Sequence, residues 1–244
     1  MTSSDPALLS RRAVLAGGLA LGALMATGPL PGTAEPALAA TRNLRRGDRG
    51  SDVAALQRRL NALGFWCGAV DGVFGHLTQQ AVWAVQKHNR LVRDGIVGPM
   101  TRGALSRGSI PKPVSITGSG VEVHLRRQLL LVVSGGRTEV TLNTSTGNGQ
   151  YYWYRGRRYR AVTPTGWYQV YSTYSKGWQH GPLGSLYRPM YFNGEIAVHG
   201  STSIPTYPAS HGCCRVSVGA MDMLWSTGRM KKGTRVVVAN GPAA

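Results

Sequence analysis

The spacing of apolar residues changes once along this chain, and that change constrains the fold more than any other feature. In SDVAALQRRLNALG, residues 51–64, apolar side chains recur at helical spacing until a glycine ends the run. After residue 120 the period becomes two, in short runs rich in Val, Leu, Tyr and Thr that Gly and Pro separate. Only SVGAMDMLWS, residues 217–226, has a helical pattern there, with Ser217 as its expected N-cap. The sequence therefore predicts an α+β multidomain chain: a small helical domain followed by a mainly β domain, a sandwich or partial barrel.

An internal repeat supports the helical part. DGVFGHLTQQAV at residues 71–82 and DGIVGPMTRGAL at residues 94–105 share the form D-G-apolar-apolar-G-x-x-T-x-x-A-apolar. Each copy is typical of an Asp-Gly turn, followed by a second glycine and a threonine placed to cap a short helix. We therefore expect one helical domain over residues 44–105 and the β domain over residues 121–240.

The segment between them, SRGSIPKPVSITGSG at residues 106–120, has the composition of a linker. It holds proline, glycine and serine without an apolar period. Fully extended it spans on the order of 50 Å, from about 3.4 Å per residue. The two domains can therefore sit apart.

The first 40 residues have the pattern of an export signal. SRR at residues 10–12 precedes an apolar run over residues 13–27, and ALA at residues 37–39 is typical of a cleavage site. The paired arginines resemble the twin-arginine variant. A membrane anchor is the alternative, but the run is short for the roughly 20 residues of a spanning helix. We expect cleavage near residue 40, no stable membrane insertion afterwards, and a location in the cell wall, periplasm or extracellular face.

The chain is strongly basic, with a formal net charge of +18. Cleavage preserves this charge, because residues 1–40 contain two arginines and two acidic residues that cancel. An exported protein meets few nucleic acids, so we expect no nucleic-acid partner. Anionic wall polymers, peptidoglycan carboxylates or acidic lipids fit the charge better. Simple solubility in an arginine-rich proteome explains it equally well.

One stretch of the β part combines aromatic and basic residues, YYWYRGRRYR at residues 151–160. Such interleaving can mark a surface for single-stranded nucleic acid, which an exported protein rarely meets. A solvated hairpin tip and a substrate-facing flap both remain open, and the sequence assigns no site here.

The stretch HGSTSIPTYPASHGCCRV, residues 199–216, concentrates chemically reactive residues. A zinc site is not favoured by this pattern. Two adjacent cysteines do not form the C-x-x-C motif with which two sulfurs bind one ion, and no H-E-x-x-H motif occurs. A disulfide would need either a strained ring between neighbours or Cys67 across the linker; Cys67 and Cys214 can equally be small buried thiols. The third alternative is a nucleophile, Cys213, with His199 at a strand end as its base and Gly212 allowing close approach of substrate.

Residues 44–105 resemble the three-helix peptidoglycan-binding domain common in cell-wall hydrolases. The resemblance rests on LRRGDRGSDVAALQRRLNALGF, DGVFG and DGIVGPMT taken together. Two departures are Val85, where the family usually has an aromatic residue, and Arg90, which replaces a usual glycine. The resemblance implies binding of peptidoglycan glycan, and a mere spacer is the alternative.

Residues 121–240 resemble the L,D-transpeptidase catalytic domain. HGSTSIPTYPASHGCCRV is similar to the family signature of a histidine, then S-H-G-C-apolar-R or N, and TPTG at residues 163–166 and LNTSTGNG at residues 142–149 also match. By position the resemblance implies Cys213 as nucleophile and His199 as general base, with His211 as the rival base. The residues expected to shape the site are Ser210, His211, Gly212 and Arg215. The amides of Gly212 and Cys213 would be the oxyanion donors, and Arg215 would hold a substrate carboxylate.

The resemblance also implies a reaction. Cys213 would attack the amide that joins a diamino acid, usually meso-diaminopimelate, to the terminal D-alanine of a peptidoglycan tetrapeptide stem. An amine of a neighbouring stem would then take the acyl group and form a 3-3 cross-link. Water instead of the amine would give an L,D-carboxypeptidase. No metal or organic cofactor is expected, and the family implies acylation by carbapenems. A non-catalytic wall-binding protein and a zinc hydrolase are the rival classes.

Overall fold

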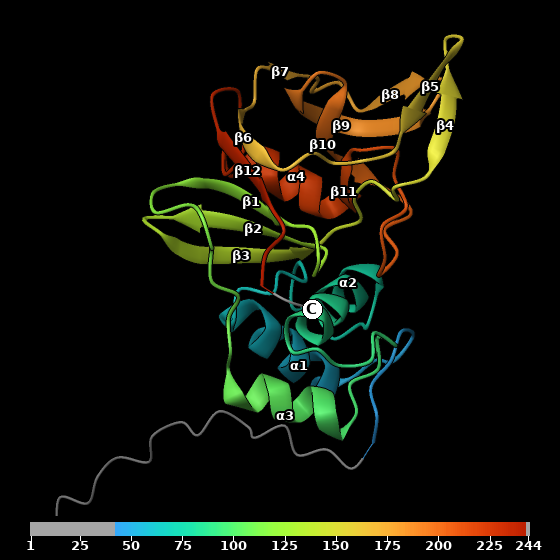
Figure 1. Cartoon of the computed structure of the whole chain (residues 1–244). Helices are drawn as coiled ribbons and strands as arrows, with labels where there is room; N and C mark the ends of the chain where they lie inside the picture. Colours follow the sequence, from blue (N-terminus) through green and yellow to red (C-terminus); the bar gives the residue numbers. More distant parts are fainter. Residues whose placement is uncertain (1–41, 243–244) are drawn as a thin grey trace, which may run out of the picture. The chain divides into compact units, whose positions relative to one another are not determined.

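The helical part of the chain contains three helices in the computed structural model, which describes residues 42–242 (Figure 1). They are α1 (Ser51–Ala62), α2 (His76–His88) and α3 (Pro99–Arg107). The export-signal prediction falls on residues outside the described range. Within that range, no helix is long and apolar enough to cross a membrane.

The two threonines of the repeat hold turns instead of capping helices. α2 and α3 begin after glycines with no side-chain cap, so the capping prediction is wrong. Gln57 Nε2 donates to Asp71 Oδ1 at 2.7 Å and to Thr78 Oγ1 at 3.1 Å. The second copy repeats these bonds at 2.7 and 3.2 Å, through Gln86, Asp94 and Thr101. The repeat in the sequence is therefore a repeated hydrogen-bond network that ties each helix to the turn and helix after it.

Two sheets form the β part of the chain (Figure 1). The first has the order β3-β2-β1-β12-β6, with bounds β1 Gly120–His124, β2 Leu129–Ser134, β3 Arg137–Asn143, β6 Gly166–Gln169 and β12 Arg235–Ala239. The second has the order β11-β10-β9-β7 with β8 against β9, and its bounds are β7 Ser172–Thr173, β8 Trp178–Gly181, β9 Gly184–Asn193, β10 Ile196–Ser201 and β11 Cys214–Ser217. β4 (Tyr151–Tyr154) and β5 (Arg157–Arg160) pair only with each other. Helix α4 (Val218–Ser226) follows β11, and its predicted cap is confirmed, since Ser217 Oγ accepts from Ala220 N at 3.2 Å.

The core of the β domain lies between these two sheets. Leu130 and Val132 of β2 pack in one buried cluster with Met190 of β9 and Val198 of β10. α4 adds its buried face to the same cluster through Met221. The expected sandwich is therefore confirmed.

The opposite face of the first sheet packs against the helical domain. Leu129, Leu131 and Val133 alternate with the inward residues of β2 and share a buried cluster with the helices. Gly64 also accepts from Thr141 N at 2.7 Å, at the edge of β3. β2 is thus covered on both faces, which explains its unbroken apolar run. The expectation that the linker lets the domains sit apart is wrong here, because the two share a hydrophobic core.

A buried lysine on α2 fastens the helical domain to the β domain. Lys87 Nζ donates to the carbonyls of Gln128 at 2.9 Å and Thr144 at 3.0 Å, and also to Asn143 Oδ1. An ammonium has three donors, so these acceptors complete its hydrogen bonds. Burial, with a smaller contribution from Arg93, lowers the pKa of Lys87 well below its ordinary value. The lysine thereby positions the LNTSTGNG segment. This segment contacts the reactive stretch, since Thr144 Oγ1 donates to Arg215 O at 2.7 Å.

Substitution of Lys87 by methionine is expected to destabilise the protein. The change leaves three buried oxygens without their donor, which should lower the free energy of unfolding by about 2 to 4 kcal/mol. Urea denaturation measures this loss. The matched control is Lys112→Met at an exposed lysine, for which we expect a change within about 0.5 kcal/mol. Equal stabilities of the two variants would contradict the fastening role.

Candidate active site

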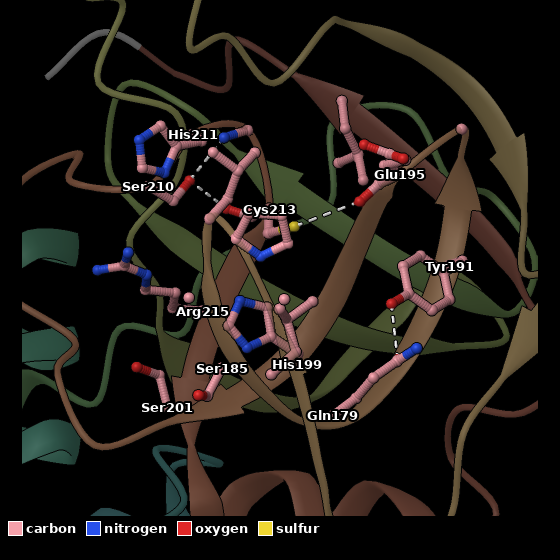
Figure 2. Close-up of a pocket in the computed structure, with 18 of the residues that line it drawn as sticks. Gln179, Ser185, Tyr191, Glu195, His199, Ser201, Ser210, His211, Cys213 and Arg215 are labelled. Atoms are coloured by element: carbon pink, nitrogen blue, oxygen red, sulfur yellow. Dashed lines mark hydrogen bonds between the residues drawn. The ribbon is translucent and has the colours of Figure 1, made fainter. Parts of the chain in front are cut away.

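The reactive stretch is brought together where β10 and β11 run side by side. The strands are parallel, with Val198 opposite Cys214 and His199 opposite Arg215. Side chains alternate between the faces of a strand, so the fully buried Val198 and Cys214 point into the core. His199 and Arg215 point to the other face, as does the partly exposed Cys213 just before β11. Figure 2 shows the resulting pocket, which the thiol of Cys213 and the imidazole of His199 both line.

The loop before β11 is held by its own hydrogen bonds. Ser210 Oγ donates to Cys213 O at 2.6 Å and accepts from Gly212 N at 3.0 Å. Thr163, from the TPTG segment, donates to Gly212 O at 2.6 Å. Gly212 has φ +146, and a Cβ there would lie 2.9 Å from Val162 O. Only glycine fits this position, so the backbone of the loop that carries Cys213 is fixed at Gly212.

Burial favours the protonated form of the Cys213 thiol. Its Sγ donates to Glu195 O at 3.6 Å and accepts from Ala197 N at 3.5 Å. Desolvation raises the pKa of the thiol, and Glu195 adds to this effect, while the Ala197 amide and Arg215 oppose it. The sulfur therefore needs a base before it can act as a nucleophile.

The buried His199 is oriented by a backbone carbonyl. Its Nδ1 lies 2.8 Å from Gly200 O. A carbonyl can only accept, so Nδ1 carries the proton and Nε2 keeps a free lone pair. Desolvation lowers the pKa of His199 to about 4, the Gly200 carbonyl opposes this effect, and Arg215 adds to it. The raised pKa of the thiol and the lowered pKa of the imidazole both favour the uncharged form of the pair.

Comparison with known proteins decides the family. The L,D-transpeptidase catalytic domain model matches residues 118–238, and the putative peptidoglycan binding domain model matches residues 49–105. The crystal structure of an L,D-transpeptidase from Xylanimonas cellulosilytica DSM 15894 is 50% identical, with a TM-score of 0.78; the match covers 82% of this chain and 98% of that chain. The chain belongs to the L,D-transpeptidase family.

Other relatives match the helical part alone. N-acetylmuramoyl-L-alanine amidase CwlM of Mycobacterium tuberculosis is 42% identical over 87 residues, 36% of this chain and 20% of the amidase. A spore cortex-lytic enzyme of Bacillus cereus is 41% identical over 66 residues, 27% of this chain and 26% of that enzyme. The chain spans about a fifth to a quarter of the length of these curated relatives. What it shares with them is the peptidoglycan-binding domain that the transpeptidase domain follows.

The other predicted site residues are His211, Arg215 and Gly212, and each has a different environment. His211 is exposed, and its ring meets Tyr152 edge-on at a centroid distance of 4.7 Å. Arg215 is half-buried in the pocket, and no carboxylate of the described residues lies within salt-bridge distance of it. The Gly212 amide is already bonded to Ser210 Oγ. The prediction that Gly212 supplies an oxyanion donor is therefore wrong for this conformation, which leaves the Cys213 amide of the expected pair.

Several residues that line the pocket were not predicted as site residues. The cavity has a volume of about 450 Å³, and Tyr152, Tyr154, Glu195 and Tyr191 contribute to its wall. Tyr191 donates to Gln179 Oε1 at 2.8 Å (Figure 2). The alternating tyrosines of residues 151–160 were the one signal in the sequence, because in a strand they share a face. Glu195 carried no signal, since a single acid in an Asn-Gly-Glu turn is usually a solvated residue.

Metal and disulfide chemistry receive no support from the described residues. Across residues 42–242, no group of three or more His, Cys, Asp or Glu side chains is arranged to hold a metal ion. Cys67, Cys213 and Cys214 are free thiols. Burial raises the pKa of Cys67 to about 12 and that of Cys214 above its ordinary range. Of the three thiols, only that of Cys213 lines the pocket that His199 also lines.

Proposed function

We propose that this protein is a peptidoglycan L,D-transpeptidase that forms 3-3 cross-links through a thioester on Cys213. The observation that carries the proposal is the placement of Cys213 and His199 on one side of neighbouring parallel strands, facing one pocket, within an L,D-transpeptidase catalytic domain. An acyl-transfer reaction needs this pair, because sulfur attacks a carbonyl only after it loses its proton.

The first half-reaction acylates the enzyme. His199 Nε2 takes the proton of the Cys213 thiol as Sγ attacks the carbonyl between the diamino acid and the terminal D-alanine. This transfer requires Sγ to turn from Glu195 O toward His199, and substrate binding commonly tightens such contacts. The Cys213 amide stabilises the oxyanion. His199 then gives the proton to the departing amine, so that the C–N bond breaks, D-alanine leaves and the thioester remains.

The second half-reaction transfers the acyl group to an acceptor. The amine of a neighbouring stem attacks the thioester, His199 accepts the proton that the amine loses, and the thiolate leaves and is reprotonated. The new amide is the 3-3 cross-link. Arg215, a pocket cation without a carboxylate partner among the described residues, binds a substrate carboxylate. The same attack on a β-lactam carbonyl makes Cys213 the site of carbapenem acylation.

The peptidoglycan-binding domain places the pocket at its insoluble substrate. Because its helices share a core with the first sheet, the two domains approach one polymer in a fixed relation instead of on a tether. A second contact with the same polymer raises the effective concentration of stems at the pocket. The charge of +18 adds attraction toward wall carboxylates and other anionic wall polymers, which salt weakens. This work requires a position in the cell wall or at the outer cell surface.

The proposal is tested by mass spectrometry of products from a disaccharide tetrapeptide incubated with the purified protein. The expected products are free D-alanine and a dimer. The mass of the dimer is that of two substrate molecules minus that of one D-alanine molecule. Release of D-alanine with only tripeptide monomer would instead make the enzyme an L,D-carboxypeptidase. Intact tetrapeptide would reject both activities and leave a wall-binding protein.

A further inference from the structure

The β4–β5 hairpin is built apart from the sandwich. β4 and β5 pair with each other and with neither larger sheet (Figure 1). The two residues of the turn, Arg155 and Gly156, have φ values of 49° and 73°. Positive φ at both positions is typical of the type I′ turn that closes two-residue hairpins. A lone two-stranded hairpin is marginally stable in water, so this one needs an anchor.

The inner face of the hairpin provides that anchor at the mouth of the pocket. Tyr152 and Tyr154 alternate on β4, and both line the cavity that holds Cys213. Tyr152 stacks on Tyr159 of β5 at a centroid distance of 5.8 Å and meets the His211 ring at 4.7 Å. The base of the hairpin is tied to the site loop, because Asn148 N donates to Ser210 O at 3.0 Å. The hairpin is thus a wall of the pocket. The interpretation of residues 151–160 as a solvated hairpin tip holds only for its outer face.

The outer face of the hairpin is aromatic, cationic and open to solvent. Tyr151 is 62% exposed and Trp153 72% exposed. The Arg158 guanidinium lies 3.9 Å from the centroid of the Tyr151 ring, and Arg160 is the cross-strand partner of Tyr151. Residues 148–162 contain four arginines and no acidic residue. Trp, Tyr and Arg are the residue types that dominate binding energy at interfaces, and here they contribute nothing to the hydrophobic core.

The chemistry of this face fits a polymer that has sugar rings with apolar C–H faces and that carries carboxylates. Arginines bind carboxylates with paired hydrogen bonds, and exposed aromatic rings offer flat surfaces against which pyranose rings can lie. A glycan strand of peptidoglycan carries both features, since its stem peptides end in carboxylates and its backbone is made of sugar rings. The inner face borders the pocket, so the hairpin lies next to any stem that enters the pocket.

We infer that the outer face of the β4–β5 hairpin, formed by Tyr151, Trp153, Arg158 and Arg160, binds the glycan strand that bears the reacting stem. The inference rests on the proposed function, because the stem in the pocket brings the strand to the hairpin. It assigns the catalytic domain a glycan contact of its own, in addition to the helical domain. The hairpin then favours polymeric substrate over free stem peptide.

The test compares polymeric and free substrate in a hairpin variant of the full chain. The variant is Tyr151→Ala/Trp153→Ala, which leaves the pocket-lining tyrosines in place. For soluble glycan strands that carry tetrapeptide stems, we expect KM to rise about five- to tenfold, the usual effect of losing aromatic contacts at an interface. For the free tetrapeptide, kcat and KM should stay unchanged. Binding of the same strands to a Cys213→Ala background, measured by calorimetry, tests the contact even where no turnover occurs.

Trp167 supplies the matched control. It is 59% exposed on β6 and has the Arg235 guanidinium 5.8 Å from its ring, so Trp167→Ala removes a similar surface pair away from the hairpin. This control should bind strands as the unaltered protein does. Equal loss in the control and the hairpin variant would overturn the inference. So would an equal loss on strands and free tetrapeptide, or no loss on either.

Binding to an anionic membrane surface is distinguished from glycan binding by a second experiment. Vesicles of phosphatidylglycerol are mixed with the unaltered chain and with Arg158→Gln/Arg160→Gln. We expect these two substitutions to weaken strand binding several-fold and to leave vesicle binding unchanged. Loss of vesicle binding with intact strand binding would assign the hairpin to the membrane surface and overturn the inference.

Discussion

Replacing Cys213 by alanine should abolish acyl-enzyme formation, while the same change at Cys214 should preserve it. The first change removes the attacking sulfur, which should lower the acylation rate about 10⁴-fold or more. The second removes a fully buried atom that points into the core between the sheets. The two neighbours in sequence therefore form a matched pair with opposite expected outcomes.

Intact mass after incubation with a carbapenem measures this difference. We expect one covalent adduct on the unaltered protein and on Cys214→Ala, and none on Cys213→Ala. An adduct that persists in Cys213→Ala and disappears in Cys214→Ala would reverse the assignment. A Cys213→Ala variant that still produced 3-3 cross-links would reject cysteine catalysis altogether, and sensitivity of that activity to chelators would favour a zinc hydrolase.

Replacing His199 by glutamine should lower the acylation rate about 10²- to 10⁴-fold at neutral pH, because general-base assistance to the thiol is lost. The pH dependence makes the test specific. With its pKa at about 4, His199 is neutral and competent above that pH and becomes protonated below it. The unaltered enzyme should therefore show a flat acylation rate constant from about pH 5 to 8 and a decline toward pH 4.

The His199→Gln variant should behave differently with pH. Its rate should rise as pH increases toward the raised pKa of Cys213, because hydroxide then does the work of the lost base. His211→Gln is the matched control, since it removes an exposed imidazole at the rim of the same pocket and should cost less than about tenfold. A large loss in His211→Gln with a small one in His199→Gln would make the rival histidine the base.

Much of the local structure follows directly from the sequence. The helical spacing of residues 51–64 and the alternation after residue 120 predicted the two architectures, because these periods reflect backbone geometry that depends on near neighbours. Ser217 was placed correctly as a cap for the same reason. The threonines of the repeat were misplaced. Their hydroxyls bond to the glutamine of the preceding helix, a contact that residue spacing alone does not reveal.

For the candidate site too, the sequence predicted some features and missed others. The motif around residues 199–216 named the sulfur and the imidazole, and strand alternation required that one of two adjacent cysteines face away. Three features of the site depend on the folded chain and not on residue spacing. Cys213 faces the pocket, the Gly212 amide is already hydrogen-bonded, and burial lowers the pKa of His199.

The sequence by itself determined which elements form and which residues are the candidates for the chemistry, because hydrogen-bond period and side-chain type are local properties. Only the tertiary structure decided what covers each face. The odd positions of β2 meet the helices and its even positions meet the second sheet. Likewise, one face of the β4–β5 hairpin lines the pocket while the other is exposed to solvent. The burial of a residue depends on neighbours from the whole chain, and the sequence of one strand does not specify which segments will pack against it.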